Sequence, residues 1–208
     1  MLNVKHLIMV CCVALLAAGC TNTRSSADMM PAMDREQTFD RNQDKISNLK
    51  SWQFDGRFSI RSPHGVDSAN LTWLQESARY LLKISGPLQQ GTVFIRGDAT
   101  GISYKDSKGV TDKAGSPEEL LARHTQYNLP ISSLRYWVLG RPDPTYAFNL
   151  NIGANGDLRT LSQNGWEIRY DAFKTTEPYR LPTKIILKHE SIEIVISIHD
   201  WNPDLVSG

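Results

Sequence analysis

Residues 54–61 read Phe-Asp-Gly-Arg-Phe-Ser-Ile-Arg and set the pattern for most of the chain. Phe54, Gly56, Phe58 and Ile60 occupy every second position, and polar or charged residues lie between them. This period of two is typical of a β-strand that buries one face and exposes the other, because successive strand side chains point to opposite faces. The stretch therefore predicts a half-buried strand.

The same period recurs along the chain. Alternating apolar positions also occur in residues 71–73, 80–84, 92–96, 102–104, 146–152, 166–170, 185–187 and 192–198. Short turn-forming stretches such as Ser62-Pro63-His64-Gly65 and Gly97-Asp98 separate several of these runs. Strands this close in sequence are expected to pair as an antiparallel meander. The sequence thus predicts a mainly β fold with a few helices.

Two helices are predicted between the early and late strands. Ser116-Pro117-Glu118-Glu119 supplies the N-cap, the proline at N1 and the glutamate at N3 that begin a helix. Residues 131–139 predict a second helix, and Gly140 follows where a C-terminal cap is expected. Helices laid on the concave face of a strongly curved sheet could leave an apolar cavity. A completely filled core would produce the same pattern.

The first twenty residues resemble the export signal of a bacterial lipoprotein. Lys5 precedes an apolar stretch from Leu7 to Ala18, which is too short for a permanent membrane span. The ending Ala17-Ala18-Gly19-Cys20 resembles a lipobox, which implies cleavage before Cys20 and lipid on that cysteine. The alternative is an ordinary secreted protein with an incidental cysteine.

This interpretation divides the chain into three parts. Residues 1–19 are predicted to be the signal peptide, 20–33 the lipidated cysteine and a flexible tether, and 34–208 a single domain. The domain is predicted to start with a helix at residues 34–50, with Phe39, Ile46 and Leu49 near one face. Thr21 follows the cysteine, and a residue other than Asp there favours the outer membrane under lipoprotein sorting rules.

Composition excludes several function classes. The signal segment carries one charged residue, Lys5, so the formal charge falls from +1 to zero after cleavage, and no basic excess points to nucleic acid. The three cysteines are Cys11, Cys12 and Cys20. The mature body therefore has no thiol for disulfides, catalysis or metal binding beyond the one predicted to carry lipid.

Enzymatic signals are weak. The sequence has no nucleophile elbow, phosphate-binding loop, dinucleotide fingerprint or zinc-protease motif. His189-Glu190 and His199-Asp200 are adjacent pairs, but neighbours along a strand point to opposite faces. We predict no catalytic residue, no metal site and no cofactor.

The segment Gly86-Pro87-Leu88-Gln89-Gln90-Gly91 predicts a turn between two strands. Leu88 is an apolar residue inside that turn. It could fold back onto the end of the sheet, or it could project into solvent, where an exposed apolar tip usually serves a membrane or a partner.

Several of these features together resemble the LolB family of outer-membrane lipoprotein receptors. The resemblance rests on the lipobox, the turn at Gly86-Pro87-Leu88, the run Leu134-Arg135-Tyr136-Trp137-Val138-Leu139-Gly140, the run Gln163-Asn164-Gly165-Trp166 and the closing Asp200-Trp201. It covers nearly the whole mature chain. The run from Leu134 to Gly140 is its most specific part.

The resemblance implies an incomplete antiparallel β-barrel, closed by a few helices around an apolar cavity. It implies a periplasm-facing protein of the outer membrane, expected to be a monomer, that accepts acylated lipoproteins from the periplasmic carrier LolA and places them in the membrane. It assigns membrane insertion to the turn leucine, Leu88. The only non-protein group expected is the lipid on Cys20.

The side chains expected to line the cavity are the inward members of the alternating runs and one helix residue. They are Phe58, Leu71, Trp73, Leu82, Ile84, Trp137, Leu150, Ile185 and Ile194. Two other functions stay open from the sequence. One is a structural lipoprotein subunit of an outer-membrane assembly with a filled core. The other is a lipoprotein enzyme, which would need a polar pocket with shifted titrating groups.

Overall fold

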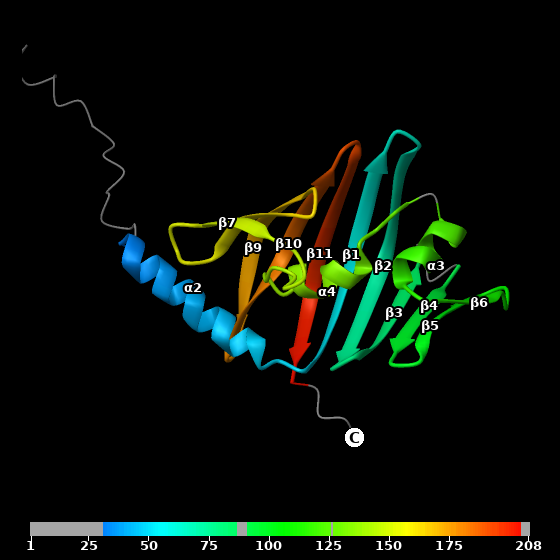
Figure 1. Cartoon of the computed structure of the whole chain (residues 1–208), viewed down its shortest axis with the longest axis horizontal. Coiled ribbons are helices and arrows are strands. Elements are labelled where there is room, and N and C mark those ends of the chain that lie inside the picture. Colours follow the sequence, from blue (N-terminus) through cyan, green and yellow to red (C-terminus); the bar gives the residue numbers. More distant parts are fainter. Residues whose placement is uncertain (1–30, 87–90, 126, 205–208) are drawn as a thin grey trace, which may run out of the picture.

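The computed structural model describes residues 31–86, 91–125 and 127–204. They form one eleven-stranded antiparallel sheet and three helices (Figure 1). The helices are α2 (Ala32–Ser47), α3 (Pro117–His124) and α4 (Ile131–Trp137). The strands are β1 (Ser51–Ser62), β2 (Gly65–Glu76), β3 (Arg79–Ser85), β4 (Val93–Asp98), β5 (Gly101–Asp106), β6 (Thr111–Ala114), β7 (Phe148–Ile152), β8 (Leu158–Gln163), β9 (Trp166–Thr176), β10 (Tyr179–His189) and β11 (Ile192–Pro203).

The sheet is an open barrel. Its strand order is β6-β5-β4-β3-β2-β1-β11-β10-β9-β8-β7, so two meanders join where the first strand pairs with the last. β6 and β7 are not paired with each other, and the sheet does not close. α3 and α4 lie against one side of it, and α2 runs past the end that carries β7 (Figure 1). The predicted incomplete antiparallel barrel with a few helices is confirmed.

Gly56 allows the close approach of β1 and β11. The register between these strands shifts between Asp55 and Gly56, where Gly56 pairs with Ile198. A Cβ atom at position 56 would lie 2.4 Å from the backbone oxygen of Ser197. Any side chain would therefore push apart the two strands that join the meanders.

The helices follow the predicted signals, with small shifts at their ends. The Ser116 side chain accepts a hydrogen bond from the Glu119 N–H at 3.1 Å, which confirms the N-cap of α3. Gly140 has a φ of +74° just beyond α4, as a C-terminal cap requires. α2 spans Ala32–Ser47 rather than 34–50, so it begins two residues inside the segment predicted to be tether.

The sequence pattern missed two strands. β6 reads Thr-Asp-Lys-Ala and β8 reads Leu-Arg-Thr-Leu-Ser-Gln. Neither has a strict alternation of apolar and polar residues. β6 is an edge strand that buries little, and β8 owes its burial to neighbours on both sides.

Aromatic side chains fill one end of the barrel interior. Trp52, Phe54, Trp73 and Trp201 are all buried, and the ring centroids lie 5.2–6.2 Å apart in every pair except Trp73–Trp201. Such tilted and edge-on contacts stabilise beyond simple area burial. These packed rings form the aromatic part of the core at this end of the interior.

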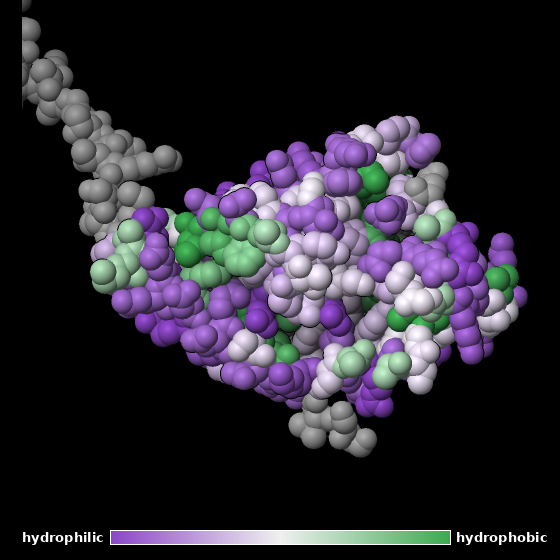
Figure 2. All heavy atoms as spheres, in the orientation of Figure 1, coloured by the Kyte–Doolittle hydropathy of each residue, from purple (hydrophilic) through white to green (hydrophobic). Residues whose placement is uncertain are grey.

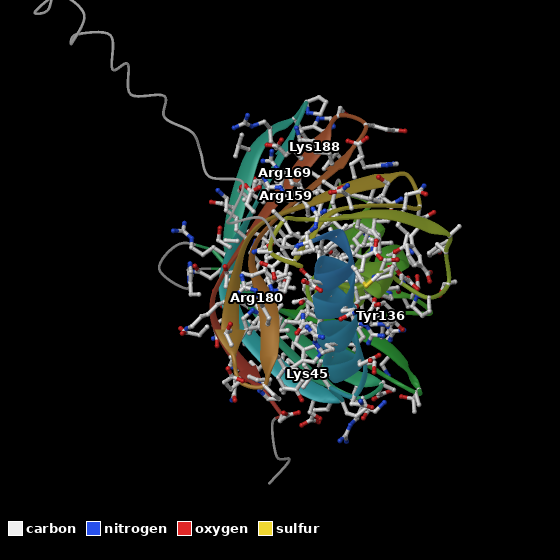
Figure 3. The ribbon with its side chains drawn as sticks, turned by 90° about the vertical axis from the view of Figure 1, so that its left-hand side faces the viewer. Lys45, Tyr136, Arg159, Arg169, Arg180 and Lys188 are labelled. Carbon is white, nitrogen blue, oxygen red and sulfur yellow. The ribbon has the colours of Figure 1, made fainter. Side chains whose placement is uncertain are left out.

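α2 is fastened to the end of β10. The Asn42 side chain donates to the Arg180 carbonyl at 2.9 Å and accepts from the Arg180 N–H at 3.0 Å. Lys45 Nζ donates to the Pro178 carbonyl at 3.1 Å, and Arg180 also pairs with Asp157 (Figure 3). Three of these contacts hold the helix against the sheet in addition to its buried face, and the Arg180–Asp157 pair joins β10 to the residue before β8.

Edge strand β7 carries apolar side chains beyond the cover of the helices. Phe148 is 47% exposed, and Leu150 and Ile152 are half-buried. Figure 2 shows the resulting apolar surface beside the first turns of α2. Within the described part of the chain, no helix has the length and apolar character needed to cross a membrane.

Candidate functional site

The candidate site is a narrow pocket between the sheet and helices α3 and α4. Its volume is about 50 Å³. It is lined only by apolar side chains: Phe58, Leu71, Trp73, Leu82, Ile84, Leu121, Leu129, Ile131, Leu134, Ile194 and Ile196. Trp73 belongs to both the pocket and the aromatic cluster, so the filled end of the barrel forms the pocket floor.

The pleating of β2 and β3 directs alternate side chains of these strands toward this pocket. Leu71 pairs with Ile84, and Trp73 pairs with Leu82, across β2 and β3. Because directly opposed residues point to the same face, these pairs form one continuous apolar wall. Phe58 and Ile84 are only half-buried, which places them at the less enclosed part of the wall.

Six of the nine residues expected in the cavity line this pocket, namely Phe58, Leu71, Trp73, Leu82, Ile84 and Ile194. Trp137, Leu150 and Ile185 do not. Trp137 is fully buried and donates from Nε1 to Gln163, and Ile185 is fully buried in β10. Leu150 lies on edge strand β7, six positions from β2 in the sheet order.

None of the lining residues on the helix side of the pocket was predicted from the sequence. Leu121 comes from α3, Ile131 and Leu134 come from α4, and Leu129 precedes α4. Their apolar spacing was visible in the sequence. Which helix face meets the strands depends on how the chain crosses the sheet, and the sequence does not carry that information.

Polar contacts at the rim hold α3 in place. His124 Nε2 lies 2.9 Å from Asp112, its ring stacks on Tyr104 at 4.0 Å, and Tyr127 bonds to Asp67. The hydrogen bond from His124 holds the pKa of Asp112 below its usual value. These contacts are partly exposed, so they stabilise the closed position of α3 only modestly.

A buried polar network holds α4 against β8. Gln163 accepts hydrogen bonds from Trp137 Nε1 and from the Asp143 N–H, each at 2.8 Å. Its amide nitrogen donates to the Asp143 and Tyr146 carbonyls at 2.8 and 2.9 Å. The Asp143 carboxylate accepts from the Ser133 hydroxyl at 2.7 Å. The network is well satisfied, which fixes α4 more firmly than α3.

Asp143 makes this network sensitive to acid. Burial alone would raise its pKa, but hydrogen bonds from Ser133 and Thr145 outweigh burial and hold the pKa below its ordinary value of 3.8. A carboxyl with a depressed folded-state pKa stabilises the protein above its unfolded pKa, and that stability is lost as the pH falls through the folded pKa.

We therefore expect Asp143→Asn to lower the free energy of unfolding by about 1–3 kcal/mol at pH 7. The difference from the wild type should shrink as the pH falls below about 4. Urea denaturation of both proteins at pH 7, 5 and 3 measures this difference in the free energy of unfolding. A difference that stays constant across this range would contradict the assignment.

A larger cleft near α4 is polar. It measures about 740 Å³ and is lined by Glu118, Asn128, Pro130, Ser132, Ser133, Tyr146, Asn164, Trp166, His189, Glu190 and Ile192. It lies on the opposite side of α4 from the apolar pocket, because Ser132 and Ser133 face it while Ile131 and Leu134 face the pocket. Its carboxylates and amides do not suit an acyl chain.

Two predicted positions, Cys20 and Leu88, lie outside the described residues. Among residues 31–86, 91–125 and 127–204, no group of three or more His, Cys, Asp or Glu side chains could hold a metal ion.

Comparison with known proteins identifies the family. The family model for the outer membrane lipoprotein LolB matches residues 50–201, which cover the sheet, the pocket and the polar network. The chain belongs to the LolB family. LolB proteins act in lipoprotein localisation, are not enzymes and use no cofactor.

Named relatives support the same assignment. The chain is 33% identical over 199 residues to the outer-membrane lipoprotein LolB of Ectopseudomonas mendocina, covering 96% of this chain and 97% of the relative. It is 32% identical to LolB of Pseudomonas paraeruginosa, covering 90% and 91%. LolB of Pseudomonas putida is 30% identical, covering 96% of each. This LolB family member is accordingly an outer-membrane lipoprotein.

Solved structures share the fold. A LolA superfamily protein from Nitrosomonas europaea aligns with a TM-score of 0.52 at 13% identity, covering 82% of this chain and 92% of that one. A DUF1329 family protein from Desulfovibrio piger aligns with a TM-score of 0.53 at 6% identity, covering 86% and 95%. The LolB fold is thus an open barrel that also occurs in proteins of very different sequence.

Proposed function

We propose that this protein is a receptor anchored in the outer membrane that accepts acylated lipoproteins from the periplasmic carrier LolA and inserts them into that membrane. The observation that carries the proposal is the pocket between the sheet and helices α3 and α4, which is lined only by apolar side chains. Acyl chains cannot cross water uncovered, since each exposed methylene costs about 0.8 kcal/mol.

The pocket must widen to hold a client. A methylene occupies about the same volume as a water molecule, roughly 30 Å³, so a sixteen-carbon chain needs several hundred Å³. The pocket volume of about 50 Å³ is far smaller. Acceptance therefore requires a helix to move away from the sheet. α3 is the better candidate, because its polar contacts are exposed while those of α4 are buried.

Transfer in one direction needs no nucleotide or catalytic residue. The acyl chains have a lower free energy in this pocket than in the carrier, and a still lower one in the bilayer. The direction follows from this order of affinities. The LolB family is not an enzyme family, which agrees with a mechanism that needs no catalytic residue.

The test uses the soluble body without Cys20. We mix it with a periplasmic carrier loaded with an acylated lipoprotein and ask which protein holds the client after separation. The acylated client is expected to move to this protein, and an unacylated client is not. If the client stays on the carrier, the interior is only core, and a structural subunit of a membrane assembly becomes the better function.

The proposed anchor is lipid on Cys20, with residues 1–19 removed and residues 20–33 linking the membrane to the domain at 34–208 on the periplasmic side. Two or three acyl chains together hold a protein firmly on a membrane. Intact-mass analysis of the membrane-extracted protein should show three acyl chains and a start at Cys20. An unmodified cysteine would remove the anchor from the proposal.

Leu88 is proposed to touch the membrane during delivery. We expect Leu88→Glu to accept lipoprotein normally and to deliver it to liposomes about tenfold more slowly or worse, because inserting one leucine contributes about 1.5–3 kcal/mol. The delivery rate from the preloaded variant measures this. The control is Val66→Glu, which alters a 63% exposed apolar side chain on β2. Unchanged delivery by Leu88→Glu would exclude the role.

A further inference from the structure

A second pocket lies between the C-terminal end of α2 and the segment that follows α4. Its volume is about 180 Å³. It is lined by Ser47, Leu49, Lys50, Trp52, Gln75, Ser77, Arg135, Tyr136, Leu139 and Arg141. Figure 3 shows Tyr136 beside the half of α2 that carries Lys45. This pocket shares no lining residue with the apolar pocket.

The pocket gathers three cations and no carboxylate. Lys50, Arg135 and Arg141 come from three different segments of the chain, and every other lining residue is uncharged. Elsewhere on the protein, arginines such as Arg123 and Arg180 pair with aspartates. Within the described residues, no ion pair joins any of the three pocket cations to an acid.

Arg135 and Arg141 are both partly buried. The Arg135 guanidinium stacks over the Tyr136 ring at 4.7 Å, and its Nη2 donates to the Tyr136 hydroxyl at 2.9 Å. Its Nε is buried and has no hydrogen-bond partner among the described atoms. Burial lowers the pKa of Arg141. Partly buried guanidinium groups without an anion destabilise a protein, so their retention here calls for a compensating ligand.

Among the described residues, Tyr136 contacts Arg135, but no protein anion pairs with any of the three cations. The carbonyls at the end of α2 already accept hydrogen bonds, at Asp44 from Ser47 and Asn48 and at Lys45 from the Asn48 N–H. Asp143 feels the charge of Arg135, but its carboxylate is bound by Ser133 and Thr145. The three cations therefore have free capacity toward a ligand from outside.

We propose that this pocket binds a phosphate group between Lys50, Arg135 and Arg141. Planar guanidinium groups match the oxygens of phosphate, and lysine adds a point charge. Ser77 and Tyr136 line the same pocket, and their hydroxyls can donate further hydrogen bonds to phosphate oxygens. The buried side chains of Leu49, Trp52 and Leu139 form an apolar part, which suits a phosphate that carries a small organic group.

Two sources share this chemistry, a free phosphate ester and the headgroup of a phospholipid. The proposal does not depend on acyl transfer, because the pocket is separate from the apolar one. It is tested by calorimetric titration of inorganic phosphate into the full-length protein in a non-ionic detergent, with ionic strength held constant by sodium chloride. Glycerol 3-phosphate and a short-chain phosphatidylglycerol below its micelle concentration form the second and third arms.

We expect saturable phosphate binding that Arg141→Gln weakens about tenfold or more, because charge-assisted hydrogen bonds are lost. Lys50→Gln should weaken it less, since Lys50 is exposed. The matched control is Arg61→Gln, which removes an exposed arginine on β1 and should leave binding unchanged. Tighter binding of the short-chain lipid than of glycerol 3-phosphate would identify a headgroup, and equal binding a free ester.

Arg135→Gln is expected to abolish binding, and circular dichroism checks that this variant folds. Lys50 is exposed and Arg141 lies outside the helices, so the Lys50→Gln and Arg141→Gln variants still test the proposal if Arg135→Gln does not fold. The proposal is overturned if the wild type shows no saturable phosphate binding. It is also overturned if Arg61→Gln weakens binding as much as Arg141→Gln does.

Discussion

Replacing Ile84 with glutamate is expected to lower acyl acceptance at least about a hundredfold while the protein stays folded. Ile84 lies on β3, lines the apolar pocket and is half-buried, so a longer polar side chain can reach water when the pocket is empty. An acyl chain in the pocket would strip that water from the carboxylate. No lining residue offers a positive charge or a hydrogen bond, so the desolvation cost of several kcal/mol is not recovered.

The measurement is the affinity of the purified body for a fluorescent sixteen-carbon acyl probe, followed by transfer of an acylated lipoprotein from the carrier. Two controls bracket the effect. Ile84→Leu keeps the wall apolar and should bind within about threefold of the wild type. Val66→Glu adds the same charge at a site 63% exposed and away from the pocket. Equal affinity of Ile84→Glu and wild type would show that acyl chains do not enter this pocket.

Trp137→Ala is expected to destabilise the protein by about 3–5 kcal/mol, the typical cost of deleting a fully buried tryptophan. Trp137 is 0% exposed, packs on Trp166 with ring centroids 6.2 Å apart and donates to Gln163 at 2.8 Å. The substitution would leave a cavity beneath α4 and remove one bond of the buried network. Trp137→Phe restores much of the volume without the donor and should cost about 1–2 kcal/mol.

Urea denaturation gives the free energy of unfolding for both variants. The sequence alone placed Trp137 in the cavity and so predicted a direct loss of acceptance. The structure places it outside the lining, and acceptance per folded molecule should stay close to that of the wild type. A large loss of acceptance at conditions where Trp137→Ala is fully folded would restore the earlier assignment.

The sequence predicted the pocket better on the sheet than on the helices. Leu71, Leu82 and Ile194 were predicted to line a cavity, and all three line the pocket. The prediction was possible because a strand directs alternate side chains to one face, and this alternation is visible in the sequence. Ile185 follows the same alternation and Trp137 follows the apolar face of α4, but both are fully buried and line no part of the pocket. Only the arrangement of layers separates a residue that lines a pocket from one that fills the core.

The three cations proposed to bind phosphate could not be recognised as one site from the sequence. Lys50, Arg135 and Arg141 stand in three segments with no shared motif, and nothing in their spacing indicates a common site. Arg135 lies inside the run from Leu134 to Gly140 that is typical of the family. Only the folded structure brings its charge close to the end of α2 and to the other two cations.

By itself, the sequence determined the class of fold, the caps of α3 and α4 and the family, because these depend on local periodicity, turn chemistry and motif. It predicted the open barrel only by resemblance. The tertiary structure decided which strands form the edges, which apolar residues enclose a pocket, and which cations lie together without an acid. Those properties arise from contacts between residues far apart in the chain, and local pattern does not specify such contacts.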